Sequence, residues 1–410
     1  MEDYKWSLNM RSSDLLFLFC TVSISLGTAA MAQEKPESPR IDSLVVDVTQ
    51  PNKHDPAVIW FDDFDDVVNW NRYPEKSGNV VEHEHFGDAG RSLQMDYPKG
   101  SRGIGGCKIF FGDSPAHRAS VVRPKESFTD VYWRIYVKHP HDWTGGGPAK
   151  LSRATSLVPP GWRQAMIAHV WSSGQALTLD PASGVRDGQV VTTRYNDFEK
   201  LRWLGNKPAS RFQLHGADGA GWWVCVEARA KLNTPGRRDG LNQLWIDGRL
   251  ETERKDLDWR GTYDSHGINA VFLEAYWNQG SPVDQSRWID NFVISTEPIG
   301  PVVCTVNPVL IKTSYRGPGN QQAWQAELAA DRSGDQIVWQ SGLNKHRDHL
   351  RIDAESGQFV GLLEGEIHLA PSSSYVCRVR QQSDSGQWSQ WSPWHQSFVT
   401  AQGEDRSLAR

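Results

Sequence analysis

Strict alternation between residues 223 and 231 constrains the fold of this chain more than any other feature. One side of the run carries Val224, Val226, Ala228 and Ala230, and the other carries Trp223, Cys225, Glu227, Arg229 and Lys231. Period two is typical of a β-strand with one buried face. A second run, 241–246, ends at Asp247-Gly248, which tolerates the positive φ angles of a two-residue hairpin turn, and 249–253 then returns. The sequence predicts an antiparallel meander here.

Short alternating runs continue from residue 58 to about 300, separated by Gly, Pro, Asn and Asp, without a helical period. This pattern predicts an all-β chain. Its 410 residues exceed the roughly 250 at which a single core stops growing, and composition shifts at Ile299-Gly300-Pro301. We expect five segments: a signal peptide (1–32), an extended leader (33–57), a first domain (58–300), a second domain (301–400) and a tail (401–410). The first domain is expected to fold without the second.

The N-terminus has the pattern of an export signal. Lys5 and Arg11 precede an apolar run at 15–30, and Ala30-Met31-Ala32 supplies a small-x-small cleavage site. The apolar run is shorter than the ~20 residues that a membrane span needs, and no other segment approaches that length. The sequence therefore predicts a secreted or periplasmic protein without a membrane span.

Charge and cysteine content narrow the function class. A net charge of −5 argues against a nucleic-acid partner, which usually requires a concentrated basic face. Cleavage would leave an even number of cysteines in an oxidising compartment, namely Cys107, Cys225, Cys304 and Cys377. Grouping by domain favours disulfides 107–225 and 304–377, while the other pairings and four free buried thiols stay open.

The second domain ends in a diagnostic stretch. Leu369-Ala370-Pro371 followed by Tyr375 resembles the tyrosine corner of fibronectin type III domains, and the run 388–392 resembles the WSxWS element that some of them carry. Arg378 and Arg380 are spaced to stack on its indoles. We interpret this domain as a spacer or as a site for a cell-surface or matrix partner. The alternative is that the Trp and Arg side chains form a ladder that only stiffens the strand edge and binds no partner.

Four motifs of the first domain resemble polysaccharide lyase family 14 and its relatives. They are LQMDYPKGS at 93–101, GGGPAKL at 145–151, KLNTPG at 231–236 and the turn at 247–248. The resemblance implies a concanavalin A-like jelly roll that acts on uronate polysaccharides, with Lys150 at the position of the family's catalytic lysine. After Leu151 this chain reads Ser152-Arg153, where the family continues with Pro-Gly. The expected fold is an all-β jelly-roll sandwich followed by a fibronectin type III-like sandwich.

Elimination on a uronate requires a carboxylate neutraliser, a base and an acid around one sugar. The run 162–171 places Arg163, His169 and Trp171 on one face at odd spacing, opposite Met166, Ala168 and Val170. Arg163 is expected to hold the carboxylate, His169 to act as base or neutraliser, and Trp171 to stack on a sugar. A solvated face with a hydrogen-bonded histidine is the alternative.

The run 268–278 adds Tyr276, a candidate proton donor or base, and Asn278, a candidate substrate contact. Glu227 and Arg229 are candidate substrate-binding residues, and an exposed cross-strand ion pair is their alternative. We predict that Glu227, Arg229, Arg163, His169 and Tyr276 line one concave surface.

Metal and cofactor signals are weak. Asp62, Asp63, Asp65, Asp66 and Asp290 are candidates for a structural Ca²⁺, against the alternative of solvated turn carboxylates. The histidines at 83, 85, 139 and 141 lack a third ligand at zinc spacing, and no nucleotide-binding fingerprint occurs. No cofactor is expected beyond that calcium.

The leading hypothesis is an exported polysaccharide lyase that cleaves an acidic, uronate-containing glycan by β-elimination. Two rivals use the same scaffold. One is a carbohydrate-binding protein without catalysis, and the other is an adhesion or matrix protein that acts through its second domain, since a fold does not fix a function.

Overall fold

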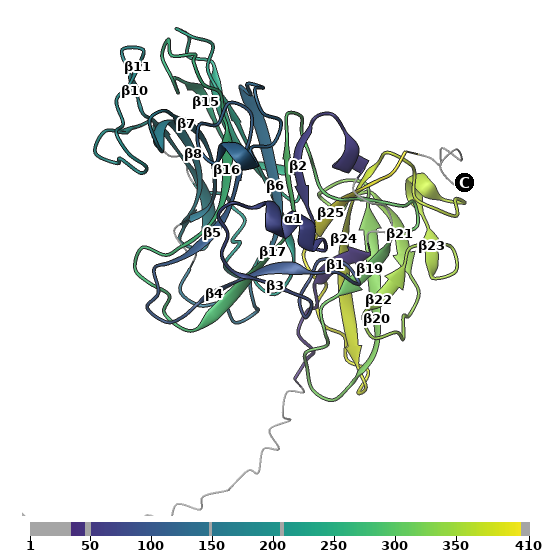
Figure 1. The fold of residues 1–410 in the computed structure, drawn as a ribbon. Helices are drawn as coiled ribbons and strands as arrows, with labels where there is room; N and C mark the ends of the chain where they lie inside the picture. The colour runs from purple at the N-terminus through teal and green to yellow at the C-terminus, as the bar shows by residue number, and fades with distance from the viewer. Residues whose placement is uncertain (1–33, 46–50, 147–149, 206–208, 403–410) are drawn as a thin grey trace, which may run out of the picture. The chain divides into compact units, whose positions relative to one another are not determined.

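The structure, a computed structural model, describes residues 34–45, 51–146, 150–205 and 209–402. Its regular elements are almost all strands, as the sequence predicts (Figure 1). The helical elements in these ranges are α1 (Val67–Arg72), η1 (Pro51–His54), η2 (Arg118–Ser120) and η3 (Gly361–Leu363). None of the helices among the described residues is long and apolar enough to cross a membrane. The predicted signal peptide lies outside the described residues.

The first domain is a sandwich of two antiparallel sheets, which confirms the predicted class. One sheet has the order β12-β9-β8-β7-β16-β5. Its strands are β5 (Gly103–Phe110), β7 (Lys150–Val158), β8 (Arg163–Ser173), β9 (Ala176–Ser183), β12 (Arg202–Trp203) and β16 (Ala270–Tyr276). A short hairpin, β10 (Val185–Arg186) with β11 (Gln189–Val190), lies between β9 and β12 in the chain.

The second sheet has eight strands in the order β15-β14-β13-β6-β17-β4-β3, and β2 also pairs with β17. Its strands are β2 (Val58–Asp62), β3 (Asn79–Val81), β4 (Ser92–Tyr97), β6 (Asp130–Lys138), β13 (Val224–Lys231), β14 (Gly240–Ile246), β15 (Arg249–Leu257) and β17 (Gln285–Ser295). We call these two sheets the six-stranded and the eight-stranded sheet.

A large apolar cluster joins the two sheets. It contains Ala154, Val170 and Leu273 from the six-stranded sheet, and Ile135 and Val226 from the eight-stranded sheet, all at most 3% exposed. Each such side chain of Val, Leu or Ile size contributes about 1.5–3 kcal/mol when it leaves water. In each sheet, the face that carries these side chains is the core face, and the opposite face is turned away from the first cluster.

The meander that the sequence predicts is present as β13, β14 and β15. Asp247 and Gly248 at its tight turn have φ angles of 46° and 72°, as a two-residue turn of the predicted kind requires. Val224 and its alternate residues belong to the first cluster. Much of the other face of β13 is buried as well: Cys225, and Trp223 just before the strand, belong to a second cluster, whereas Lys231 at its end is exposed.

That second cluster is shared with the C-terminal part of the chain. A sheet of order β18-β25-β24-β20-β21-β23 and a three-stranded sheet β1-β19-β22 enclose it. The strands are β1 (Ile41–Val45), β18 (Val303–Cys304), β19 (Val309–Lys312), β20 (Gln321–Ala329), β21 (Ile337–Ser341), β22 (His349–Arg351), β23 (Gly357–Phe359), β24 (Ser374–Ser383) and β25 (His395–Thr400).

The segment expected as an extended leader, 33–57, contains strand β1, which is part of the fold. Ile41 and Leu44 are fully buried, and β1 pairs antiparallel with β19, placing Leu44 opposite Leu310. The segment reads as a leader because Pro, Glu and Asp surround only five strand residues. Its partner strand lies about 270 positions further along the sequence, which a local pattern cannot show.

The contacts expected near the C-terminus are present. Ala370 N donates to the Tyr375 hydroxyl at 3.0 Å. Arg378 lies 4.8 and 4.5 Å from the rings of Trp391 and Trp394, and Arg380 lies 4.5 Å from those of Trp388 and Trp391. The fibronectin type III-like character of this part stays a prediction.

The predicted 107–225 disulfide is wrong. Cys107 is buried in the first cluster, whereas Cys225 is buried in the second, on the opposite face of β13 from Val224. Burial raises the pKa of the Cys107 thiol to about 12, so it stays protonated and apolar in character. Cys304 and Cys377 both belong to the second cluster.

Candidate functional site

Polar and aromatic side chains gather on the face of the six-stranded sheet that is turned away from the first cluster. The strands β8, β7 and β16 are neighbours in this sheet. Lys150 on β7 lies opposite Trp171 on one side and Tyr276 on the other, and Arg153 lies opposite His169. We call these five residues the candidate site.

Lys150 is buried beneath aromatic rings. Lys150 is only 8% exposed, and its ammonium lies 4.6 Å from the ring centre of Tyr276 and 5.8 Å from that of Phe198. Desolvation lowers the pKa of Lys150, Glu274 opposes this shift, and Arg153 adds to it. The geometry thus moves Lys150 toward the neutral amine, the form that accepts a proton.

Arg153, on the same strand as Lys150, is the centre of a polar network. It is fully buried, and its guanidinium donates to the Tyr195 hydroxyl at 2.5 Å, to Asn196 Oδ1 at 2.8 Å and to the Glu274 carboxylate. Burial raises the pKa of Tyr195, so its hydroxyl remains protonated. The network ties the loop at 195–196 to β7 and β16.

His169 is a neutral side chain, and one of its ring nitrogens makes no hydrogen bond within the described residues. Its Nδ1 lies 3.0 Å from the backbone oxygen of Asp180, so Nδ1 carries the proton and donates it. Nε2 has no hydrogen-bond partner in the described part of the chain. Burial, and then the charge of Arg153, hold the pKa of His169 well below its usual range. The ring therefore presents a lone pair rather than a cation.

Aromatic rings border the site. Trp171 lies 4.3 Å from the His169 ring, and Trp203 on β12 lies 5.9 Å from both. Phe198, Trp203 and Tyr276 are 42%, 40% and 36% exposed, unusual values for rings of that size. Exposed rings beside buried polar groups are a common arrangement for binding the apolar face of a sugar.

The structure separates Arg163 from these residues. Arg163 donates to the backbone oxygens of Pro159, Val190 and Thr192, which fixes the loop beside the strand. The pairing of β7 with β8 slips between Ser156 and Leu157, so that Leu157 lies opposite Gln164. This bulge turns Gln164, instead of Arg163, to the face of His169. The predicted alternation is wrong at this end of β8.

Glu227 and Arg229 do not belong to the candidate site either, because both lie on the eight-stranded sheet. The Glu227 carboxylate accepts from Ile299 N at 3.0 Å and Gly300 N at 2.8 Å. Arg229 pairs with Asp130 at 2.6 Å. The predicted single surface is wrong for these two residues, whose side chains hold the chain together after β17 and along β6. Asn278 lies in an exposed turn just after β16.

Two further residues of the site carry only weak sequence signals. Tyr195 and Phe198 lie in a loop between β11 and β12, without strand periodicity. Their position over the sheet depends on the bonds of Arg153 to Tyr195 and Asn196. By contrast, Arg153 and Glu274 alternate with core residues of β7 and β16, so the sequence does indicate the face on which they lie.

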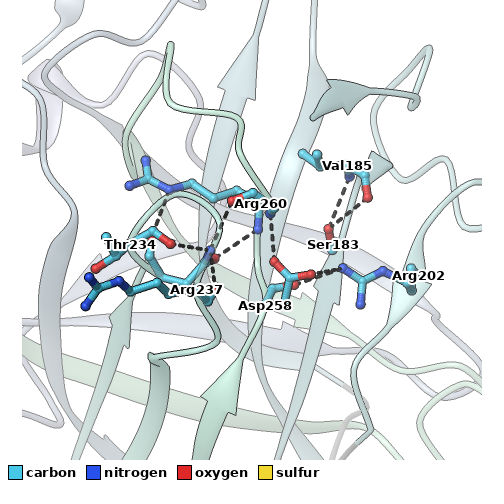
Figure 2. Close-up of polar contacts among 9 residues, drawn as sticks. Ser183, Val185, Arg202, Thr234, Arg237, Asp258 and Arg260 are labelled. Atoms are coloured by element: carbon cyan, nitrogen blue, oxygen red, sulfur yellow. Dashed lines mark hydrogen bonds and ion pairs between the residues drawn. The ribbon is translucent and has the colours of Figure 1, made fainter. Parts of the chain in front are cut away.

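The KLNTPG motif builds a loop and is not part of the site. Asn233 is fully buried, and its amide donates to the backbone oxygens of Thr234, Arg237 and Gly261 at 3.0–3.3 Å, while its oxygen accepts from Arg260 N. Beside it, Arg202 donates to Asp258 at the edge of a cavity of about 300 Å³ (Figure 2). Of the GGGPAKL motif, residues 147–149 lie outside the described residues.

The acidic residues proposed for calcium do pair through their strands. Asp62 on β2 lies opposite Phe292 on β17, two residues beyond Asp290. Burial raises the pKa of Asp62 to about 6 and that of Asp290 well above its usual range. In the part of the chain that the structure describes, no group of three or more His, Cys, Asp or Glu side chains converges as a metal site would require.

Comparisons with known proteins find lyases among solved structures. No family model matches the chain, and no curated protein matches it. The PL-14 alginate lyase from Aplysia kurodai is 17% identical, with 58% of this chain and 99% of that one covered at a TM-score of 0.40. Alginate lyase vAL-1 from Chlorella virus is 14% identical, with 58% of this chain and 99% of that one covered at a TM-score of 0.42. The endo-β-1,4-glucuronan lyase from the fungus Trichoderma reesei is 13% identical, with 63% of this chain and 94% of that one covered at a TM-score of 0.38.

Proposed function

We propose that this protein is an exported polysaccharide lyase that cleaves a uronate-containing glycan by β-elimination. One observation carries the proposal: Lys150, with its lowered pKa, lies against the exposed phenol of Tyr276, on the same strand as the buried Arg153. The aromatic rings of Trp203 and Phe198 lie beside this pair. The motif resemblance at Lys150 points to the same residue independently.

In this mechanism the neutral amine of Lys150 takes the proton from C5 of the uronate. The electron pair of the C5–H bond forms the C4=C5 double bond, and the bond from C4 to the glycosidic oxygen breaks. Tyr276 donates its hydroxyl proton to that oxygen, and the proton on Lys150 returns to Tyr276 before the next cycle. No water is consumed, and one product carries an unsaturated uronate end.

The buried residues act through these two. Arg153 places positive charge near the amine and lowers its pKa. Such preorganised charge also stabilises the negative charge that develops on the sugar carboxylate during proton removal. His169 is fully buried. We assign it a positioning role under Trp171, while the lone pair on Nε2 makes it the second candidate base.

One observation favours the alternative of sugar binding without catalysis. Lys150 is only 8% exposed, because the rings of Tyr276 and Phe198 cover its ammonium. In a binding protein those two rings would form a platform, and Lys150 would only support it. An adhesion role would instead use the Trp and Arg ladder of the C-terminal part.

A product assay separates these functions. The mature protein is incubated with a panel of uronate polysaccharides, and ultraviolet absorbance reports the unsaturated product. We expect activity on at least one polymer, and we expect Tyr276→Phe to lose at least a hundredfold in kcat because its ring stays while the proton donor is gone. Tyr315→Phe, in the C-terminal part, is the matched control. Polymer binding without any product favours the binding protein.

A further inference from the structure

A groove separate from the candidate site lies where several stretches of the chain meet. Its volume is about 1010 Å³. The walls come from the segment before β1, the loops after β6 and before β13, and the residues around the end of β19. Gln175, in the turn between β8 and β9, completes one wall. The same hairpin carries His169 and Trp171.

Buried polar atoms with unmet hydrogen-bonding capacity line this groove. Trp222 Nε1, His215 Nδ1 and Gln381 Oε1 have no partner among the described residues. The amide nitrogen of Gln381 donates to the backbone oxygens of Glu37 and Arg316, so its free oxygen is held in place. Buried polar groups without a partner destabilise the protein, and a ligand with hydroxyl groups can satisfy them.

A buried lysine is the most demanding of these groups. Lys312, at the end of β19, is 2% exposed, and among the described residues its ammonium donates to Thr313 O at 2.9 Å. Desolvation lowers the pKa of Lys312 to about 8, against the opposing charge of Asp348. A buried ammonium bonded to a carbonyl is short of negative charge.

The other charges of the groove are largely compensated. Lys138 pairs with Asp42 at 2.7 Å and Glu84 at 2.8 Å, and His141 lies 2.9 Å from Glu37. Arg40 is stacked 4.6 Å above Trp222 and donates to a backbone oxygen. Two further carboxylates line the groove, Asp142 and Asp348, and Asp348 lies 2.7 Å from His349. Lys312 and Arg40 are cations of the groove that form no ion pair with a carboxylate among the described residues.

We propose that this groove is a second saccharide site that binds a single uronate residue, with the sugar carboxylate on Lys312 and its hydroxyls on Trp222 Nε1 and Gln381 Oε1. The choice of a uronate rests on the proposed function. Hydroxyl groups donate and accept, which matches the mixed set of free atoms. Lys312 supplies the selectivity for acid over neutral sugar.

The test measures binding without requiring cleavage. Calorimetric titration uses the mature Lys150→Ala protein with D-glucuronate and, separately, D-glucose. We expect glucuronate to bind at least tenfold more tightly than glucose. Adding Lys312→Met is expected to weaken glucuronate binding at least tenfold, whereas Lys345→Met, an exposed lysine in the same part, leaves it unchanged. Because no polymer is cut in this assay, its result is independent of lyase activity.

A second variant guards against a folding defect. Trp222→Phe removes the indole donor and keeps an aromatic ring, so we expect a smaller loss of affinity, about threefold to tenfold. Because Trp222 is buried, the melting transition of this variant should stay cooperative but move to a lower temperature. Equal binding of glucose and glucuronate would overturn the proposal. So would full glucuronate affinity in the Lys312→Met protein, or no glucuronate binding in the parent.

Discussion

Burial lowers the pKa of Lys150 and so favours its neutral amine. An exposed lysine is protonated near neutral pH, but the rings of Tyr276 and Phe198 exclude water from this ammonium and so lower its pKa. Arg153 adds like charge. Glu274 limits the shift, and its bond to Arg153 keeps that arginine in place. The residue that the motif resemblance indicates therefore acquires its reactivity from neighbours on its own strand, on β16 and in the loop that carries Phe198.

This account predicts the sign of the pH dependence. If neutral Lys150 is the base, kcat/KM rises with pH as the amine loses its proton in the free enzyme. Phe198→Ala lets water reach the ammonium, so the pKa of Lys150 increases and the rising limb moves to higher pH by about one unit. Leu362→Ala, an exposed residue of the C-terminal part, is the control. A profile that falls with pH would instead identify Lys150 as a cation.

Single residues on β8 and β16 were predictable from alternation. His169, Trp171 and Tyr276 lie together as their spacing suggests, whereas Lys150 is indicated by the motif resemblance and joins them at a register shift between Lys150 and Ser152. Arg163 does not, because a one-residue bulge reverses the faces of β8, and the sequence carries no clear sign of it. Glu227 follows the alternation correctly, yet it is covered by the chain at Ile299 and Gly300, which no local pattern reveals.

At the scale of elements, the short strand β1 takes part in both the second cluster and the groove wall. Its five residues contribute Ile41 and Leu44 to the second cluster, and they lead directly into the groove wall at Arg40. Ile41 N also donates to His395 Nε2 at 3.0 Å, which joins β1 to β25. The strand thus connects the start of the described chain to its end.

We predict that Leu44→Ala destabilises the protein by about 2–5 kcal/mol, because a fully buried leucine leaves a cavity in the second cluster. Leu343→Ala is the matched control, since Leu343 is 60% exposed and its truncation should change stability by less than about 0.5 kcal/mol. Denaturant unfolding of both variants measures the difference. Equal stabilities would mean that β1 does not pack as the structure has it.

At the scale of the whole molecule, residues 35–410 form one compact unit with two apolar clusters. The first cluster draws all its members from residues 59–294, so it supports the expectation that 58–300 folds alone. The second cluster combines Tyr136 and Trp223 of the sandwich with β1 and the C-terminal strands. That sharing could not be foreseen from the composition break near residue 300.

We therefore predict that a fragment of residues 58–300 unfolds cooperatively, but at a melting temperature at least 5 °C below that of 34–402. Loss of the second cluster exposes Tyr136 and Trp223, so the fragment should also bind a hydrophobic dye more strongly. Calorimetry of both proteins is the measurement. A fragment without a cooperative transition would show that the sandwich needs the C-terminal part to fold.

Lyase activity that depends on Lys150 is the central claim, and one assay addresses it directly. Lys150→Ala and the control Lys231→Ala, an exposed lysine at the end of β13, are compared with the parent on the uronate polymer that gives most product. We predict that Lys150→Ala forms at least a thousandfold less unsaturated product while polymer retention in affinity electrophoresis stays within threefold, and that Lys231→Ala matches the parent. Full product formation by Lys150→Ala would contradict the account.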